Sequence, residues 1–290
     1  MNSKIFSPFY TIDDNILKYL DKVEICSLPS EEKIKETILK DNGFLLNNFS
    51  YKKCENSVLI LEPHADDFAL SALGYTIDKY NSIVLNVFSK TTLKYFPWLE
   101  KINYNSEEYE NLRLKESEFV INKILSQKFI SMKEKSLRIT KESISNIEKR
   151  IISNIDKILK NNKSIKKILV PLGVGNHPDH LIIFNIIMNN IDKYKNYEII
   201  LYPEYPYSRC RNIYQDRIIK IKNKYKLTEK IIDVKEYLDI IVDCISSYKS
   251  QFDDINRNQM YAIFKEDTWG IAQDFNKYEF ALIYFKLEVK

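Results

Sequence analysis

The chain has 290 residues, of which 44% are apolar and 29% charged, with a net charge of +4 at pH 7. This composition is that of an ordinary globular protein, and the length suits one large α/β domain as well as two domains. Basic residues are spread along the chain instead of forming an arm, which argues against a nucleic-acid partner. The beginning of the chain lacks the apolar segment of a signal peptide, and no apolar run approaches the length of a membrane span. We therefore expect a cytoplasmic protein.

Two units are expected along the chain. Residues 1–50 form an N-terminal extension that packs on a main domain of residues 51–290. The main domain opens with an apolar run, Val58–Leu61, which is followed by the polar cluster His64-Ala65-Asp66-Asp67. Apolar residues at helical spacing then begin at Phe68. This order predicts a buried strand that leads directly into a helix.

Strands and helices alternate through the middle of the chain. The predicted strands are 82–89, 129–132, 166–171 and 198–202. The predicted helices are 106–127, 141–160 and 177–189, and the second carries a core-facing stripe of isoleucines at 144, 147, 151, 155 and 158. This alternation favours an α/β fold with a mainly parallel sheet and helices on both faces.

Less regular segments complete the prediction. Residues 91–104, which contain Pro97-Trp98, are expected to form a loop at the carboxyl end of a strand. From about residue 212 onward we expect two more strands and a helix around 234–251. A terminal strand is predicted at 279–285.

All three histidines of the chain lie in two short motifs, PHADD and GNHPDH, each placed after a predicted strand and at the start of a predicted helix. Because the carboxyl ends of parallel strands share one edge of a sheet, the two motifs are expected to meet there. Three ligands with an open fourth position are the pattern of a catalytic zinc, and a carboxylate that does not bind the metal can act as a base. The side chains pooled at this edge are His64, Asp66, Asp67, His177, Asp179 and His180.

Each motif also has an ordinary structural interpretation. Asp66 and Asp67 could cap the helix that follows them, and Asn176-His177-Pro178 is a common helix start. Their joint occurrence, which uses every histidine, favours a metal site. Tyr205-Pro206-Tyr207 is interpreted as a turn with packed rings in preference to a sugar platform.

The two motifs resemble the paired motifs of the LmbE-like/PIG-L zinc N-deacetylases, written (A/P)HPDDE and GHxDH. The resemblance covers about residues 55–285, with weaker similarity at Arg113-Leu114-Lys115-Glu116. It implies a Rossmann-like fold with one Zn²⁺ per chain at the carboxyl edge of the sheet, Fe²⁺ being the alternative metal. Members of this family remove acetyl groups from N-acetylglucosamine units of lipids, antibiotics or small saccharides.

The resemblance also implies a role for each matching residue. A base is expected at Asp66, a group near the developing oxyanion at His177, an orienting carboxylate at Asp179 and a substrate contact at Arg113. For Arg113, a solvated position on a charged helix face is the alternative. The chain departs from the motifs at Ala65 and Phe68, and no aromatic residue precedes His177. The implied metal ligands are His64, Asp67 and His180.

Three functions are compatible with this pattern. The first is a zinc-dependent hydrolase that removes an N-acyl group, acetyl by the resemblance, from an amino sugar or a sugar-containing conjugate. The second is a saccharide-binding or assembly protein with a vestigial metal site. The third is a zinc hydrolase that acts on a non-sugar amide or ester. The complete set of metal ligands favours an enzyme, because a protein that has lost its catalytic function is expected to have lost at least one of these ligands.

Overall fold

The computed structural model describes residues 56–77, 79–90, 106–125, 127–252, 258–259, 261 and 280–288. Two predictions lie outside these residues: the N-terminal extension of residues 1–50 and the loop at 91–104. Within the described part, no helix is long and apolar enough to span a bilayer.

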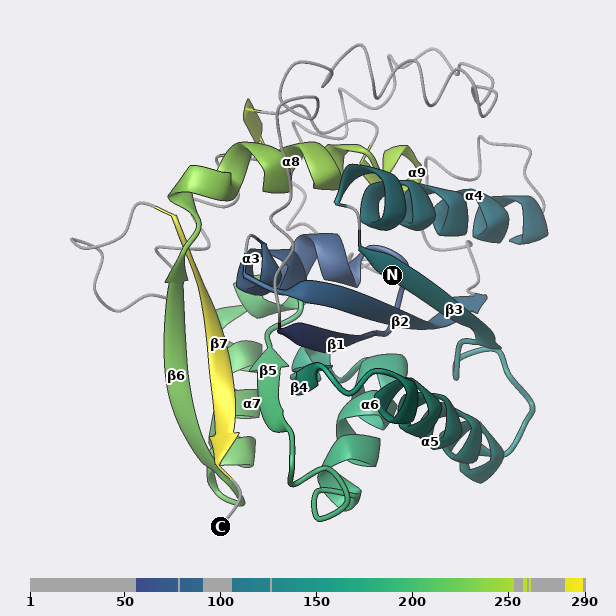
Figure 1. Cartoon of the computed structure of the whole chain (residues 1–290), viewed down its shortest axis with the longest axis vertical. Coiled ribbons are helices and arrows are strands. Elements are labelled where there is room, and N and C mark those ends of the chain that lie inside the picture. Colours follow the sequence, from purple (N-terminus) through teal and green to yellow (C-terminus); the bar gives the residue numbers. More distant parts are fainter. Residues whose placement is uncertain are drawn as a thin grey trace, which may run out of the picture.

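Seven strands of the described chain form one sheet in the order β3-β2-β1-β4-β5-β7-β6 (Figure 1). The five strands β1 to β5 run parallel, whereas β7 runs antiparallel to both β5 and β6. This arrangement confirms the predicted α/β fold with a mainly parallel sheet. The strands are β1 (Ser57–Glu62), β2 (Asn81–Lys90), β3 (Lys128–Lys135), β4 (Ile165–Pro171), β5 (Glu198–Tyr202), β6 (Lys226–Asp233) and β7 (Ala281–Glu288).

Helices cover both faces of the sheet, as predicted (Figure 1). Two of them are continuous with π-helical turns: Phe68–Ala72 leads into α3, and Phe119–Ile124 extends α4. The α-helices are α3 (Leu73–Thr76), α4 (Ser106–Glu118), α5 (Ile144–Asn161), α6 (Pro178–Asn189), α7 (Arg211–Lys222), α8 (Leu238–Ser246) and α9 (Lys249–Phe252).

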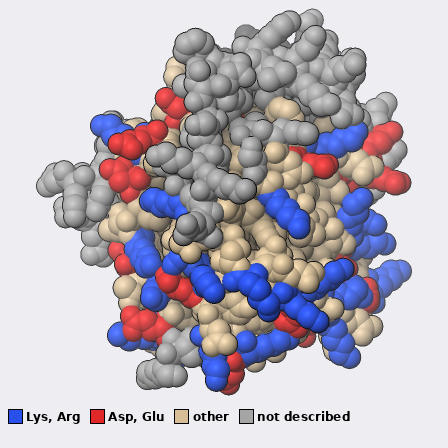
Figure 2. Space-filling model, viewed as in Figure 1, with Lys and Arg blue, Asp and Glu red and all other residues tan. Residues whose placement is uncertain are grey.

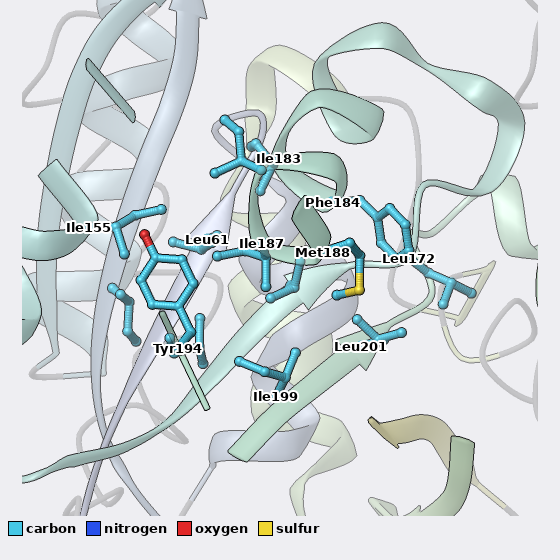
Figure 3. Packing of buried hydrophobic residues seen from close by; sticks show 14 of the residues in the cluster. Leu61, Ile155, Leu172, Ile183, Phe184, Ile187, Met188, Tyr194, Ile199 and Leu201 are labelled. Atoms are coloured by element: carbon cyan, nitrogen blue, oxygen red, sulfur yellow. The ribbon is translucent and has the colours of Figure 1, made fainter. Parts of the chain in front are cut away.

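The strands separate two hydrophobic cores because successive side chains of a strand point to opposite faces. In β1, Leu59 and Leu61 pack with α5, α6 and α7, whereas Val58 and Ile60 pack with α3 and α8. Figure 3 shows the first core, in which side chains of α6 lie beside Leu61 and β5. Each fully buried aliphatic side chain stabilises the fold by roughly 1.5–3 kcal/mol. All six residues of β1 are buried, which fixes the strand that carries the first motif.

Two predictions about the helices need correction. Ile144 belongs to the predicted core stripe, but its side chain is 56% exposed because it is the first residue of α5, just after the Ser143 cap. From about residue 212 onward two strands and a helix are expected, and β6 and α8 agree with this, but the start of the region forms the unpredicted helix α7. The buried face of α7 consists of Tyr214, Ile218 and Ile221.

Charged side chains are mixed on the visible surface. Lys and Arg spread over the lower half of the face in Figure 2, with Asp and Glu between them. Several form surface pairs, such as Lys167 with Glu198 at 2.7 Å and Lys193 with Asp156 at 2.5 Å. Pairs of this kind contribute about 0–1 kcal/mol each. The mixture agrees with the even spread of charge along the sequence.

The strand order places the two motifs next to each other. The chain passes from β1 outward to β2 and β3, and then returns to β4 on the other side of β1. Ligands of open α/β sheets bind at such a point, outside the carboxyl ends of the strands where the order reverses. PHADD follows β1 and GNHPDH follows β4, so both motifs lie at this point.

Candidate metal centre

The first motif is a tight turn fixed by backbone contacts and a buried carboxylate. The backbone N–H groups of Asp66 and Asp67 donate to the carbonyl of His64, at 2.8 and 3.2 Å. The Asp67 carboxylate in turn accepts the backbone N–H of His64 at 2.8 Å. Glu62 accepts the backbone N–H of Phe68 at 3.0 Å. The sequence allowed Asp66 or Asp67 to cap the helix, but Glu62 performs that role and leaves both aspartates for the site.

The second motif combines a glycine turn with a helix cap. Gly173 and Gly175 have φ angles of 79° and 76°, a region that side chains disfavour. His177 is the N-cap of α6, and its Nδ1 accepts the backbone N–H of Asp179 at 3.2 Å. The predicted helix start is therefore correct. A neutral imidazole whose Nδ1 accepts a hydrogen bond carries its proton on Nε2, so His177 presents an N–H donor on the opposite side of its ring.

Three side-chain atoms from the two motifs converge on one point. His64 Nδ1 lies 3.2 Å from His180 Nε2 and 3.7 Å from Asp67 Oδ2, and His180 Nε2 lies 3.5 Å from the same oxygen. Ligands at about 2.0–2.1 Å from a tetrahedral zinc are separated from one another by roughly 3.3 Å. The spacing of these atoms therefore fits a single cation. His177 is close by, since the three histidines each offer a ligand atom within 4.8 Å of the others.

The outer nitrogen of each converging imidazole faces a buried carboxylate. His64 Nε2 lies 2.9 Å from Asp179 Oδ2, and His180 Nδ1 lies 3.0 Å from Glu204 Oε1. When these outer nitrogens donate, the inner nitrogens hold lone pairs that point at each other and at Asp67. Hydrogen-bond acceptors that face one another with no proton between them require a positive charge there. These three atoms are therefore suited to bind a metal cation.

Both supporting carboxylates are held by backbone donors. Asp179 accepts the N–H of Leu137 at 2.7 Å, which fixes it against the segment after β3. Glu204 accepts the N–H groups of Gly173 and Val174, at 2.6 and 3.2 Å, and is fully buried. Sequence reasoning missed Glu204. The one feature of the sequence that indicates Glu204 as a site residue is its position just after a predicted strand, at the same edge of the sheet as the motifs.

The charges of the centre follow from the shifted pKa values of its buried side chains. Burial favours neutral His180, but Asp67 and Glu204 more than offset this and raise its pKa to about 9. Burial and the two other histidines lower the pKa of His177 to about 2. Burial opposes ionisation of Asp179, but the hydrogen bond with His64 and other donors hold its pKa at about 2. One proton on His180 therefore supplies positive charge that a bound cation would replace.

Asp66 is set apart from the three converging atoms. Its Oδ1 lies 2.9 Å from Arg113 Nη2 on α4, and among the described residues its side chain forms no ion pair with a histidine. Arg113 is 9% exposed, so the alternative of a solvated arginine is wrong. The ion pair fixes one oxygen of Asp66, and within the described part of the chain Oδ2 has no assigned partner.

Tyr207 forms part of the wall of the centre. Its ring centroid lies 5.7 Å from that of His180, edge to face, and 6.4 Å from that of His177. A Cβ atom at Gly175 would lie 2.7 Å from the ring, so the glycine makes room for it. The predicted turn with packed rings is confirmed for this residue, and the rings it meets are those of the site.

No protein-family model and no curated protein sequence matches the chain. Solved structures do. The zinc-inhibited form of teicoplanin deacetylase Orf2 has 14% identity and a TM-score of 0.59, over 80% of this chain and 98% of Orf2. The N,N'-diacetylchitobiose deacetylase of Pyrococcus horikoshii has 15% identity and a TM-score of 0.54, over 91% and 95%. GalB, a 4-carboxy-2-hydroxymuconate hydratase of Pseudomonas putida, has 10% identity and a TM-score of 0.55, over 81% and 97%.

These similarities establish the fold. The architecture of the chain is that of the teicoplanin and chitobiose deacetylases, which confirms at the level of the fold the resemblance indicated by PHADD and GNHPDH. GalB shows that the same architecture also occurs in a hydratase. The chemistry of this chain must therefore be argued from its own site.

Proposed function

We propose that the chain is a metal-dependent hydrolase that removes an N-acyl group, acetyl in the first instance, from an amino sugar or a sugar-containing conjugate. The observation that carries the proposal is the convergence of two imidazole nitrogens and one carboxylate oxygen, at 3.2–3.7 Å from one another, beside a separate aspartate. The fold shared with two deacetylases and the two motifs support the choice of reaction.

The metal would be held by His64 Nδ1, Asp67 Oδ2 and His180 Nε2, with Zn²⁺ as the first candidate and Fe²⁺ as the alternative. A divalent metal bound there would polarise the substrate carbonyl and lower the pKa of water. Asp179 and Glu204 would orient the two imidazoles, as outer carboxylates do for metal-binding histidines.

Asp66 is the proposed base. Arg113 holds Oδ1, and the other oxygen, Oδ2, accepts the proton of the attacking water, whose oxygen adds to the amide carbon. Asp66 then passes this proton to the nitrogen as the C–N bond breaks, which gives a free amine and acetate. The Nε2–H of His177 points away from its capped Nδ1 and would donate to the amide oxygen as negative charge develops there.

The test is acetate release from N-acetylglucosamine and N,N'-diacetylchitobiose by the purified chain, with metal content measured on the same sample. Chelation should abolish release, and one equivalent of Zn²⁺ should restore it. A metal-loaded protein that releases acetate from neither compound, nor from an acylated glycopeptide, would contradict the proposal. A protein that purifies without metal and takes up none would instead favour a vestigial site.

A further inference from the structure

The inner face of α4 carries polar groups, whereas the buried face of a helix is ordinarily apolar. Among the described residues of α4, the buried ones lie at helical spacing and are Tyr109, Arg113, Glu116 and Ser117. Residues at this spacing share one side of a helix. Replacement of buried charged groups by apolar side chains is often neutral or stabilising. Stability of the fold therefore gives no reason for charged groups on this face.

The short helix α9 supplies the partners of this face and lies beside α4 (Figure 1). The backbone N–H of Ser250 donates to Glu116 Oε1 at 2.9 Å, and the Ser250 hydroxyl donates to Glu116 Oε2. The Tyr109 hydroxyl donates to the backbone carbonyl of Ser250 at 3.1 Å. All three polar groups of Ser250, its N–H, hydroxyl and carbonyl, therefore bind α4.

Arg113 lies on the same face, one turn after Tyr109 and one turn before Glu116. Its Nη2 pairs with Asp66 at 2.9 Å, whereas its Nε is buried and has no hydrogen-bond partner within the described part of the chain. A long side chain loses much rotamer freedom when it is held in one position. A single ion pair must therefore be supported by the surroundings of the guanidinium, and Tyr109 and Glu116 are close enough for their charges to act on it.

We propose that Ser250 is a positioning residue for the base Asp66. It binds Tyr109 and Glu116, on either side of Arg113, and thereby fixes the helix face from which the guanidinium reaches the carboxylate. Because Arg113 holds Oδ1 of Asp66, the position of the guanidinium sets the direction of Oδ2 toward the attacking water. The inference rests on the proposed function, in which Asp66 is the base.

Ser250→Ala removes the hydroxyl bond to Glu116 and leaves the backbone bonds of residue 250 in place. Displacement of a reacting group by about 1 Å can lower a rate about 10²-fold. Because part of the support remains, we expect kcat to fall about tenfold and KM to change less than about threefold. Metal content should match the wild type, since Asp66 is not a proposed ligand.

A purely structural role of Ser250 is the competing explanation, and a second background separates the two. In Asp66→Asn the base that Ser250 positions is gone, so Ser250→Ala should change the residual kcat less than about twofold. A general loosening of the fold would instead lower kcat by the same factor in both backgrounds. Equal losses in the two backgrounds would overturn the inference.

A second variant and a control remove the dependence on one substitution. Tyr109→Phe keeps the ring, loses the bond to the Ser250 carbonyl, and should show the same dependence on Asp66. Ser247→Ala is the matched control: Ser247 is fully buried just before α9, and its hydroxyl donates to the Asp243 carbonyl at 2.8 Å. This control should keep the wild-type kcat.

The mobility of Arg113 can be measured without turnover. The ¹⁵Nε signal of Arg113, identified by its loss in Arg113→Lys, should report an immobile side chain in the wild type and in Ser247→Ala. It should report greater mobility in Ser250→Ala and Tyr109→Phe. Equal mobility in all four proteins would overturn the inference and leave the proposed function standing. A wild type without deacetylase activity would overturn the proposed function and, with it, the catalytic role of Ser250.

Discussion

Glu204→Gln tests whether the buried carboxylate behind His180 sets the metal affinity of the centre. In the structure Glu204 accepts three hydrogen bonds, from Gly173 N–H, Val174 N–H and His180 Nδ1–H. A glutamine of the same shape has one accepting oxygen, and its NH₂ group must face at least one of these donors. The substitution therefore removes the negative charge behind His180 and leaves a buried donor unsatisfied.

The size of the effect follows from these contacts. An unsatisfied buried donor costs about 1–3 kcal/mol of the free energy of unfolding. Loss of an outer carboxylate typically lowers metal affinity about 10- to 100-fold, which corresponds to about 1.4–2.8 kcal/mol. We expect both changes in Glu204→Gln, the first in the metal-free protein and the second in the metal titration.

Zinc affinity is best measured by competition with a chromophoric chelator, and stability by urea unfolding of the metal-free protein. Glu198→Gln is the matched control, because Glu198 begins β5 at the opposite edge of the sheet and pairs with surface lysines. It should keep the wild-type zinc affinity and lose at most about 1 kcal/mol of stability for each ion pair that is removed. Wild-type zinc affinity in a folded Glu204→Gln protein would refute the role assigned to Glu204.

Three further results are expected. Asp66→Asn should retain the metal, measured by elemental analysis, and lose about 10²–10⁴-fold in kcat because no base remains; normal turnover would exclude Asp66 as the base. Zinc affinity should rise with pH up to about 9. Burial lowers the pKa of His180, but Asp67 and Glu204 more than offset this and raise the pKa to about 9. Binding of the metal therefore displaces a proton from His180. Calorimetry at pH 7.5 in two buffers of different ionisation enthalpy should detect this proton release, and heats independent of the buffer would contradict it. Burial raises the pKa of Glu116 from 4.5 to about 7. Between these pH values the folded protein keeps a proton that the unfolded chain has lost. The free energy of unfolding should therefore fall as pH rises from 4.5 to 7, by at most roughly 3 kcal/mol. Urea unfolding of Glu116→Gln should lack this decrease, and an unchanged slope would assign it to other groups.

The sequence predicted the sheet well because its central strands are buried on both faces. Continuous apolar runs such as Val58–Leu61 and Ile168–Val170 cannot be surface segments, and they lie within β1 and β4. Helix α7 was missed for the opposite reason. Its outer face carries Ile213 and Ile219, which are 42% and 57% exposed, so isoleucine does not mark the buried face there. In a chain rich in isoleucine, periodicity identifies a helix less clearly.

At the site, the sequence located what lies close together along the chain. It missed Glu204, and it did not predict which site residues Arg113 and Tyr207 contact. PHADD and GNHPDH each place several polar groups on one turn, so spacing alone was informative. Glu204 and Tyr207 approach His180 from the segment after β5, and Arg113 reaches Asp66 from α4. Each of them is a single polar residue in an ordinary segment, and its contribution depends on a contact that only the folded sheet creates.

The structural and chemical interpretations of the second motif are linked. His177 caps α6, as expected for an ordinary helix start. Because its Nδ1 accepts the backbone N–H of Asp179, its proton lies on Nε2. The same Asp179 then uses its carboxylate to hold His64 Nε2. The helix cap therefore sets the tautomer of His177, the proposed oxyanion donor. The Asp179 carboxylate, in the first turn of the helix, sets the tautomer of His64, a proposed metal ligand. It follows that Asp179→Asn should disturb His64 alone, because the backbone N–H of residue 179 that fixes His177 remains. Histidine ¹⁵N chemical shifts, which distinguish the tautomers, should change for His64 while the backbone cap at His177 is retained, and an unchanged His64 tautomer would break the link argued here.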